Sequence, residues 1–135
     1  MAKMIILAGL PGAGKSTLAK KMVKQDQTYV RVNLDDIRSM LGTSDFNKEK
    51  LVEQIELISI GYAFNQKYNV IVDDTNLNPK KINKLKVIAK QYNAEVDYKL
   101  ISTDVEECIR RDALRERPVG EDVIRRFYEK YHENL

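Results

Sequence analysis

Residues 4–16 read MIILAGLPGAGKS, a short apolar run followed by a glycine-rich loop that ends in Lys15 and Ser16. This is the arrangement of a phosphate-binding P-loop, whose glycines allow successive backbone N–H groups to turn toward the phosphates of a nucleoside triphosphate (NTP). Lys15 then reaches the β- and γ-phosphates, Ser16 ligates Mg²⁺, and the helix that begins there adds the positive end of its dipole. An apolar strand precedes the loop and a helical stretch to about Gln25 follows it, which favours the motif over a chance glycine-rich turn. We therefore predict that the nucleotide is bound by Gly12, Ala13, Gly14, Lys15, Ser16 and Thr17.

Length and composition indicate one small domain. The chain has 135 residues, near the common size of a single domain, so we expect one P-loop domain over residues 1–135. The single cysteine, Cys108, cannot form an internal disulfide, and the apolar run at the N-terminus is too short for a signal peptide. No stretch approaches a membrane span, so we expect no membrane partner. The net charge of +3 is too small to indicate a nucleic-acid partner by itself, so any polyanion site must be local.

Short apolar runs alternate with longer amphipathic stretches, which is typical of an α/β fold. The predicted strands cover residues 4–8, 29–33, 69–73 and 96–102. Beyond the helix that follows the P-loop, helices are predicted over residues 48–68, 80–92, 105–114 and 121–132. Ligands of a parallel sheet bind beyond the carboxyl ends of its strands. The polar residues that follow each strand are therefore the candidate site.

After the second strand, Asp35 is predicted at a helix N-terminus, with Arg38 three residues later on the same face of one turn. A carboxylate in that place can orient an attacking hydroxyl and accept its proton, and an arginine can hold a phosphate of the acceptor through two hydrogen bonds. The alternative is an N-cap followed by an ion pair within the helix. The position of the pair at a strand end of a P-loop protein favours the catalytic interpretation.

The third strand closes on Asp73 and Asp74, carboxylates that are candidates to hold Mg²⁺ or its water shell beside Ser16. Adjacent residues of a strand point to opposite faces, so we expect one aspartate to reach the nucleotide and the other to cap or pair. Thr75 and Asn76, which follow directly, are candidates to face the acceptor.

Four arginines, at positions 110, 111, 115 and 117, precede the helix breakers Pro118 and Gly120. Such a segment can close as a lid and deliver a guanidinium over the γ-phosphate, where it neutralises the charge that develops in transfer. Arg111 and Arg115 stand at i,i+4 on one face and are the predicted lid pair on the nucleotide. The other two arginines are interpreted as solvated residues that favour the helix dipole.

Other conspicuous residues are interpreted as structural. The lysines between residues 80 and 90 are typical of a solvated helix face, with attraction of a polyanionic acceptor as the alternative. Cys108 lies on the apolar face of its helix and is interpreted as a core residue. The single histidine, His132, stands near the end of the chain and is interpreted as a surface residue.

These motifs resemble the 5′-hydroxyl kinase domain of phage polynucleotide kinases. The matching strings occur in the same order along almost the whole chain: GLPGAGKS at 9–16, NLDDIR at 33–38, DTNLNP at 74–79, the arginines of 111–115, and residues 119–125. DTNLNP is the specific string, because many unrelated NTPases share the P-loop. The resemblance implies a P-loop NTPase-type three-layer α/β fold with a four-stranded parallel sheet flanked by helices.

The resemblance also implies roles for individual residues. Asp35 is the general base, Arg38 grips the acceptor phosphate, Asp74 and Thr75 belong to the active site, and Arg115 is the lid arginine on the donor phosphates. With Lys15, the implied catalytic set is Lys15, Asp35, Arg38, Asp74 and Arg115. Two departures from the family pattern stand out: residues 115–119 are one residue shorter, and the phosphatase domain of the phage enzymes does not follow, so we expect no 3′-end processing.

We therefore expect an ATP- and Mg²⁺-dependent enzyme of nucleic-acid end repair that phosphorylates the 5′-hydroxyl of DNA or RNA in the cytoplasm of a bacterial or phage-infected cell. A kinase of a small-molecule hydroxyl is the nearest alternative, because the same scaffold serves both. A non-catalytic nucleotide-binding module is the other, although it would not need the Asp35 carboxylate. The sequence leaves open the choice of RNA or DNA, single or double strands, the preferred NTP, the oligomeric state, and which of Arg111 and Arg115 is the main lid arginine.

Overall fold

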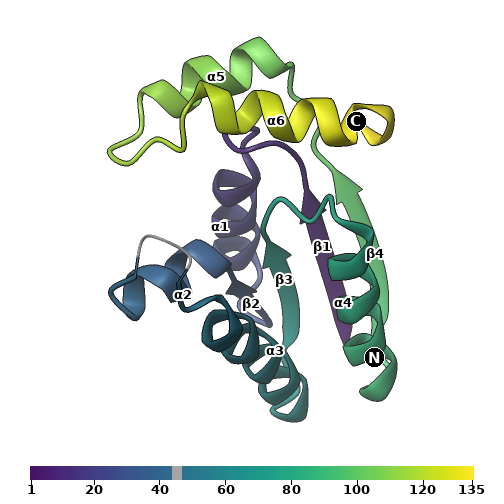
Figure 1. Cartoon of the computed structure of the whole chain (residues 1–135). Helices are drawn as coiled ribbons and strands as arrows, with labels where there is room; N and C mark the ends of the chain where they lie inside the picture. Colours follow the sequence, from purple (N-terminus) through teal and green to yellow (C-terminus); the bar gives the residue numbers. More distant parts are fainter. Residues whose placement is uncertain (44–46) are drawn as a thin grey trace.

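The computed structural model describes residues 1–43 and 47–135, with residue 134 described by its backbone alone. Its strands are β1 (Lys3–Ala8), β2 (Tyr29–Val32), β3 (Asn69–Asp73) and β4 (Glu95–Leu100). The helices are α1 (Lys15–Gln25), α2 (Leu34–Met40), α3 (Glu49–Asn65), α4 (Pro79–Gln91), α5 (Val105–Ala113) and α6 (Glu121–Tyr131), with a final 3₁₀ turn over His132–Asn134 (Figure 1).

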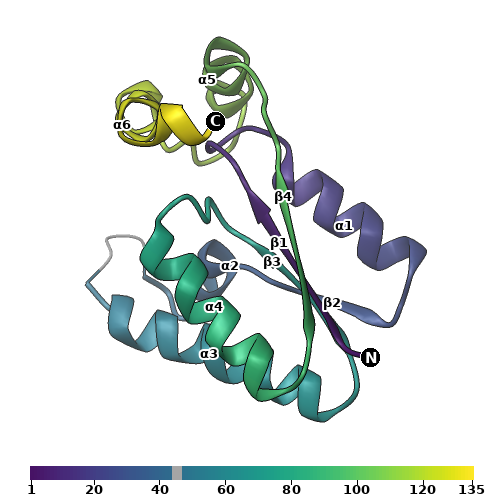
Figure 2. The same cartoon turned by 90° about the vertical axis from the view of Figure 1, so that its right-hand side faces the viewer.

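The strands form one parallel sheet in the order β2-β3-β1-β4. Helix α1 covers one face of this sheet, and α3 and α4 cover the other (Figure 2). The chain therefore has the predicted three-layer α/β fold with a four-stranded parallel sheet. Parallel strands point their carboxyl ends to one edge, so the residues after all four strands lie at the same end of the sheet.

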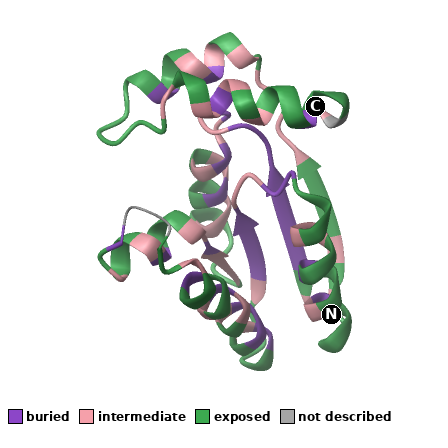
Figure 3. Ribbon diagram, viewed as in Figure 1, coloured by how far each residue is buried: buried purple, intermediate pink, exposed green. Residues whose placement is uncertain are grey.

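The core follows the two-residue period of the strands. Met4 and Ile6 of β1 pack into the cluster formed with α3 and α4, whereas Ile5 and Leu7 pack against Ala19 of α1. β1 is buried from Met4 to Ala8 because it has a neighbour on each side and helices on both faces. The P-loop thus starts from the most buried strand among those described (Figure 3).

Helices α5 and α6 lie across the carboxyl ends of the strands (Figure 1). A separate apolar cluster holds them there, with Cys108 and Ile124 fully buried against Ala8, Leu10 and Ala13 of the P-loop region. The interpretation of Cys108 as a core residue is confirmed. Among the described helices, none is long and apolar enough to cross a membrane.

Several predicted boundaries shift by one to three residues for identifiable reasons. Helix α3 ends at Asn65 rather than at residue 68, because Lys67 adopts a left-handed conformation with φ of 71° that reverses the chain into β3. Strand β2 ends one residue early, because Asn33 becomes the N-cap of α2 and accepts a hydrogen bond from the backbone N–H of Asp36. Strand β4 ends at residue 100 and α5 at residue 113.

Candidate active site

The P-loop adopts a conformation that only glycine tolerates at two of its turns. Gly12 and Gly14 have φ of 85° and 106°, and a Cβ at Gly12 would stand 2.5 Å from the carbonyl oxygen of Cys108 on α5. Lys15 Nζ donates to the carbonyl oxygens of Gly9 (2.9 Å) and Leu10 (2.7 Å). The loop is thus closed around its own lysine and pressed against α5.

The surroundings of Lys15 destabilise its charged form relative to its neutral form. Burial lowers the pKa of this lysine to about 8, although the nearby Asp73 carboxylate acts in the opposite direction. The positive charge of Arg115 also lowers the pKa of Lys15, because like charges repel. An anion bound beside Lys15 would reverse the trend, because an opposite charge favours the ammonium form.

Ser16, the residue predicted to ligate Mg²⁺, shares a network with Arg31 of β2 and Asp73 of β3. Arg31 Nε donates to Asp73 Oδ2 (2.7 Å) and Arg31 Nη2 to Ser16 Oγ (3.3 Å), while Arg31 Nη1 pairs with Asp36 at short range. Sequence reasoning missed Arg31. The signal was a charged residue inside the apolar strand YVRV, on the same face as Asp73 by the two-residue period.

Ser16 and Asp73 fit the requirements of a Mg²⁺ site. Asp73 is 1% exposed, and its Oδ1 has no hydrogen-bond partner among the described residues, so a buried carboxylate oxygen is available near the P-loop hydroxyl. No cluster of three or more candidate metal ligands exists in the described part of the chain. Mg²⁺ beside a nucleotide needs no such cluster, because phosphates and waters complete its shell. Ser16 and Asp73 are the residues that would hold it.

The Asp74 side chain points away from this network and contacts α2 and α4. Its Oδ1 accepts from the backbone N–H of Leu34 (2.8 Å) at the start of α2, and its Oδ2 lies 3.4 Å from Lys81 Nζ. Lys81 is also 2.5 Å from Glu56 Oε1 of α3. The interpretation of all the α4 lysines as solvated is therefore wrong for Lys81, because α3 packs over its position and supplies a buried partner.

Glu56 is 1% exposed, and its pKa is raised to about 9 by burial and by its hydrogen bond with Asp74, against the attraction of Lys81. Burial and the neighbouring Asp74 carboxylate therefore both favour the protonated form of Glu56, whereas Lys81 favours the ionised form. Glu56 Oε2 is buried and has no hydrogen-bond partner among the described residues. Glu56 and Lys81 thus fix Asp74, and Asp74 fixes the start of α2.

Helix α2 presents Asp35 and Arg38 together. Arg38 Nη1 donates to Asp35 Oδ1 (2.6 Å), and the same guanidinium donates to both carboxylate oxygens of Glu49, at 2.5 and 3.0 Å. The ion pair within the helix therefore exists, and it leaves the Asp35 side chain 72% exposed. Glu49, the first residue of α3, was not expected from the sequence, because no local pattern links it to Arg38.

The residues after Asp74 have different surroundings. The carbonyl oxygen of Thr75 accepts from the backbone N–H of Gly9 (3.0 Å), which places this threonine beside the start of the P-loop. Asn76 does not face an acceptor: it is 2% exposed and donates to the carbonyl oxygens of Leu7 (2.7 Å) and Val72 (3.2 Å). Its inward amide ties β3 to β1, with φ of 47° at the turn.

The predicted lid residues lie at the end of α5. Arg111 Nη1 donates to the carbonyl oxygen of Ala13 in the P-loop (3.3 Å). Arg115 lies beyond the last residue of the helix, so the two arginines do not share one helical face, and it donates to Asp112 Oδ1 (3.3 Å). Asp112 is buried and also accepts from the backbone N–H groups of Val119 and Gly120, which holds the α5–α6 loop in a fixed turn.

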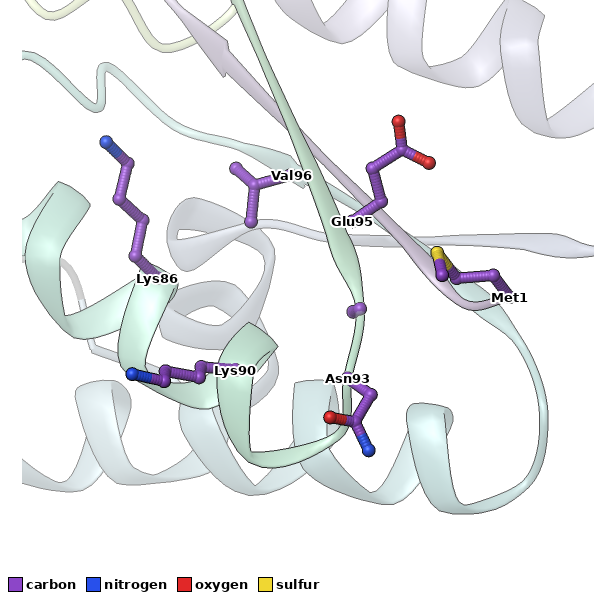
Figure 4. Close-up of a pocket in the computed structure, with 7 residues that line it drawn as sticks. Met1, Lys86, Lys90, Asn93, Glu95 and Val96 are labelled. Carbon is purple, nitrogen blue, oxygen red and sulfur yellow. The ribbon is translucent and has the colours of Figure 1, made fainter.

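A shallow hollow elsewhere on the surface does not belong to this site. It lies between the end of α4 and the start of β4, and is lined by Met1, Lys86, Lys90, Asn93, Ala94, Glu95 and Val96 (Figure 4). Glu95 pairs with Lys3 at the first residue of β1, whereas the P-loop follows the last one. The hollow and the P-loop are therefore at opposite ends of the sheet.

Comparison with known proteins agrees with this architecture. The protein-family model described as "AAA domain" matches residues 4–134. The chain belongs to this family. The chain is 30% identical over 132 residues to the L-seryl-tRNA(Sec) kinase of Methanococcus maripaludis. It is 24% identical over 147 residues to the putative bifunctional polynucleotide kinase/RNA ligase of Autographa californica nuclear polyhedrosis virus.

A solved structure extends the comparison to three dimensions. A chain of the Pnkp1/Rnl/Hen1 RNA repair complex superposes on 99% of this chain with a TM-score of 0.83 and 25% sequence identity. The resemblance of this family member to polynucleotide kinase domains is thereby confirmed. The matches cover 95% and 96% of this chain but only 52% of the archaeal relative and 21% of the viral one, and the chain spans 46% of the repair-complex chain.

Proposed function

We propose that residues 1–135 form a kinase domain that transfers the γ-phosphoryl group of ATP to the 5′-hydroxyl end of a polynucleotide. The observation that carries the proposal is the tie between the P-loop side and α2. Asn33 Nδ2 donates to the carbonyl oxygen of Asp73 at short range, and Asp74 accepts from the N–H of Leu34. Two adjacent residues at the end of β3 therefore hold the start of the helix that carries Asp35 and Arg38, and the Asp73 side chain also bonds Arg31, which contacts Ser16 of the P-loop.

On the donor side, the P-loop N–H groups and Lys15 would hold the β- and γ-phosphates, and Arg111 and Arg115 would reach them from α5. Mg²⁺ held by Ser16 and Asp73 would neutralise charge on the phosphate oxygens. Arg111 already bonds the P-loop carbonyl of Ala13, so a small rearrangement brings its guanidinium to a phosphate. The site would supply mainly positioning and opposite charge, which is most of what phosphoryl transfer requires.

On the acceptor side, the hydroxyl oxygen attacks the γ-phosphorus, its proton passes to the Asp35 carboxylate, and ADP leaves. Arg38 would hold the neighbouring phosphate of the acceptor. Its guanidinium now bonds both oxygens of Glu49, and a phosphate presents paired oxygens that can bond a guanidinium in the same way. The acceptor phosphate would therefore take the place of Glu49.

The choice of a polynucleotide rests on the relatives. The names of the viral relative and of the repair complex both refer to polynucleotides or RNA, and both matches cover at least 96% of this chain. A seryl hydroxyl on a transfer RNA is a second candidate acceptor, favoured by the 30% identity to the archaeal seryl-tRNA kinase. Both acceptors place a hydroxyl near nucleic-acid phosphates.

The deciding experiment is a competition for γ-labelled ATP. The purified protein is incubated with 5′-hydroxyl RNA, 5′-hydroxyl DNA, a nucleoside 3′-monophosphate, the bare nucleoside and seryl-tRNA. Label on the 5′ end of the oligonucleotides supports the proposal. Label on the seryl group favours the second candidate, and preferred labelling of the bare nucleoside contradicts both.

A further inference from the structure

Arg31 is an unusual residue for its place in the fold. It stands in β2 with its side chain 15% exposed, and it contacts three different elements: Asp73 of β3, Asp36 of α2 and Ser16 of α1. A guanidinium this well enclosed is stable only with opposite charges around it. Here two carboxylates supply that charge.

The contact of Arg31 with Ser16 does not serve to neutralise the guanidinium, because a hydroxyl carries no charge. Arg31 Nη2 lies 3.3 Å from Ser16 Oγ while its Nε holds Asp73 Oδ2 at 2.7 Å. The guanidinium therefore touches both residues that fit Mg²⁺ at this site. The remaining Asp73 oxygen has no partner among the described residues.

We propose that Arg31 is a built-in cation of the nucleotide site, which competes with the divalent metal for Ser16 and Asp73 and lowers the metal requirement of nucleotide binding. The inference rests on the nucleotide-binding half of the proposed function and not on the acceptor. Without metal, Arg31 supplies positive charge beside Ser16, in addition to the charge of Lys15 in the P-loop. With metal, the guanidinium leaves Ser16 and remains near Asp36, whose side chain is 66% exposed and free to follow it.

A purely structural role for Arg31 makes a different prediction. If the arginine only joins β2, β3 and α2, its replacement weakens nucleotide binding by the same factor with and without metal. If it competes with the metal, the two conditions respond in opposite directions. The readout is therefore the dissociation constant of the nucleotide without metal divided by that with metal. This ratio measures the coupling between metal and nucleotide.

The test compares Arg31→Gln with the wild type in calorimetric titrations with a non-hydrolysable ATP analogue, once in EDTA and once in saturating Mg²⁺. Removing the cation should weaken metal-free binding and strengthen the metal-dependent step, so the ratio should rise by about tenfold or more. Mn²⁺ bound in the presence of the analogue, followed by electron paramagnetic resonance, should show a matching gain in metal affinity. Arg126→Gln removes an exposed arginine of α6 and is the matched control, with an unchanged ratio.

Arg31→Lys keeps the protein testable if the glutamine variant does not fold, because Asp73 retains a cation. A lysine cannot reach three partners at once, so the ratio should rise in the same direction by a smaller factor. A ratio within twofold of the wild type in the variants that fold overturns the proposal. Neither measurement involves an acceptor, so failure of the polynucleotide assignment would leave this result readable.

Discussion

The two faces of the sheet are built for different tasks. On the α1 face, Ser16, Arg31 and Asp73 form one network beside the P-loop. On the α3 and α4 face, Glu56 and Lys81 hold Asp74, which in turn holds α2 and its catalytic candidates. Adjacent aspartates of one strand end thus serve opposite sides, as the two-residue period of a strand requires.

If the proposed function is right, the contrast shows how a small domain separates the phosphate donor from the acceptor. The proposed donor side combines the P-loop, which follows the buried strand β1, with the side-chain network of Ser16, Arg31 and Asp73. The proposed acceptor side is held together by ion pairs between different helices, such as Arg38 of α2 with Glu49 of α3. We therefore expect substitutions on the donor side to affect ATP binding and those on the acceptor side to affect transfer.

The largest effect should come from Asp35→Asn. A carboxamide of the same shape cannot accept the proton of the attacking hydroxyl, and general-base help is worth about 10²- to 10⁴-fold in rate. ATP affinity, measured by calorimetry, should stay near that of the wild type. Asp97→Asn changes an exposed aspartate of β4 and should leave the rate unchanged. A turnover within a few-fold of the wild type would mean that Asp35 serves only as a helix residue.

Lys15→Ala should break the donor side instead. The variant loses a charge-assisted contact to the transferring phosphate, and loss of one such group costs about 10²- to 10³-fold in rate. Unlike Asp35→Asn, it should also weaken ATP binding in the same titration. Lys20→Ala on the exposed side of α1 is the control. Full turnover of Lys15→Ala would contradict the P-loop assignment.

The lid can be resolved by Arg115→Lys and Arg111→Lys. A lysine keeps the charge but loses the planar fork, so an arginine that spans two phosphate oxygens should lose about tenfold in kcat/KM. We expect the larger loss at Arg115. Normal kinetics of Arg115→Lys beside an impaired Arg111→Lys would transfer the main role to Arg111, which already contacts the P-loop.

The smallest effect should be a change in pH dependence at Glu56. Its pKa is near 9 in the folded chain and near 4.5 when unfolded, so the folded state binds the extra proton between these values. Stability should therefore fall as pH rises through that window and level off above it. Glu56→Gln should flatten this slope in denaturant melts, whereas Glu53→Gln, at an exposed position of α3, should not. Identical slopes in wild type and Glu56→Gln would show that Glu56 is ionised throughout.

The sequence predicts the features that depend on local motifs and does not predict the contacts between separate elements. The P-loop, the four strands and the α/β class were predictable, because they depend on local motifs and on period, and the three-layer arrangement followed from the family resemblance. Arg31 was in principle visible as a charge inside an apolar strand. Its partners were not, because the pairing depends on which strand becomes its neighbour.

Three charged residues of the site could not be identified from the sequence: Glu49, Glu56 and Lys81. Each lies on a helix whose exposed face is also rich in charge, so its own segment does not distinguish it. Only the packing of α3 beside α2 and α4 buries Glu56 and brings Glu49 to Arg38. Asn76 was misassigned for a related reason, since its polar side chain satisfies carbonyl groups inside the fold rather than a ligand.

The separation of donor and acceptor sides is tested most directly at Arg38. Wild type and Arg38→Ala are compared on a nucleoside 3′-monophosphate and on the bare nucleoside, with the KM for ATP measured in the same assays. We predict that the wild type prefers the phosphorylated acceptor, that the variant loses most of this preference, and that the KM for ATP changes little. An equal loss on both acceptors, or a large rise in the KM for ATP, would contradict the account.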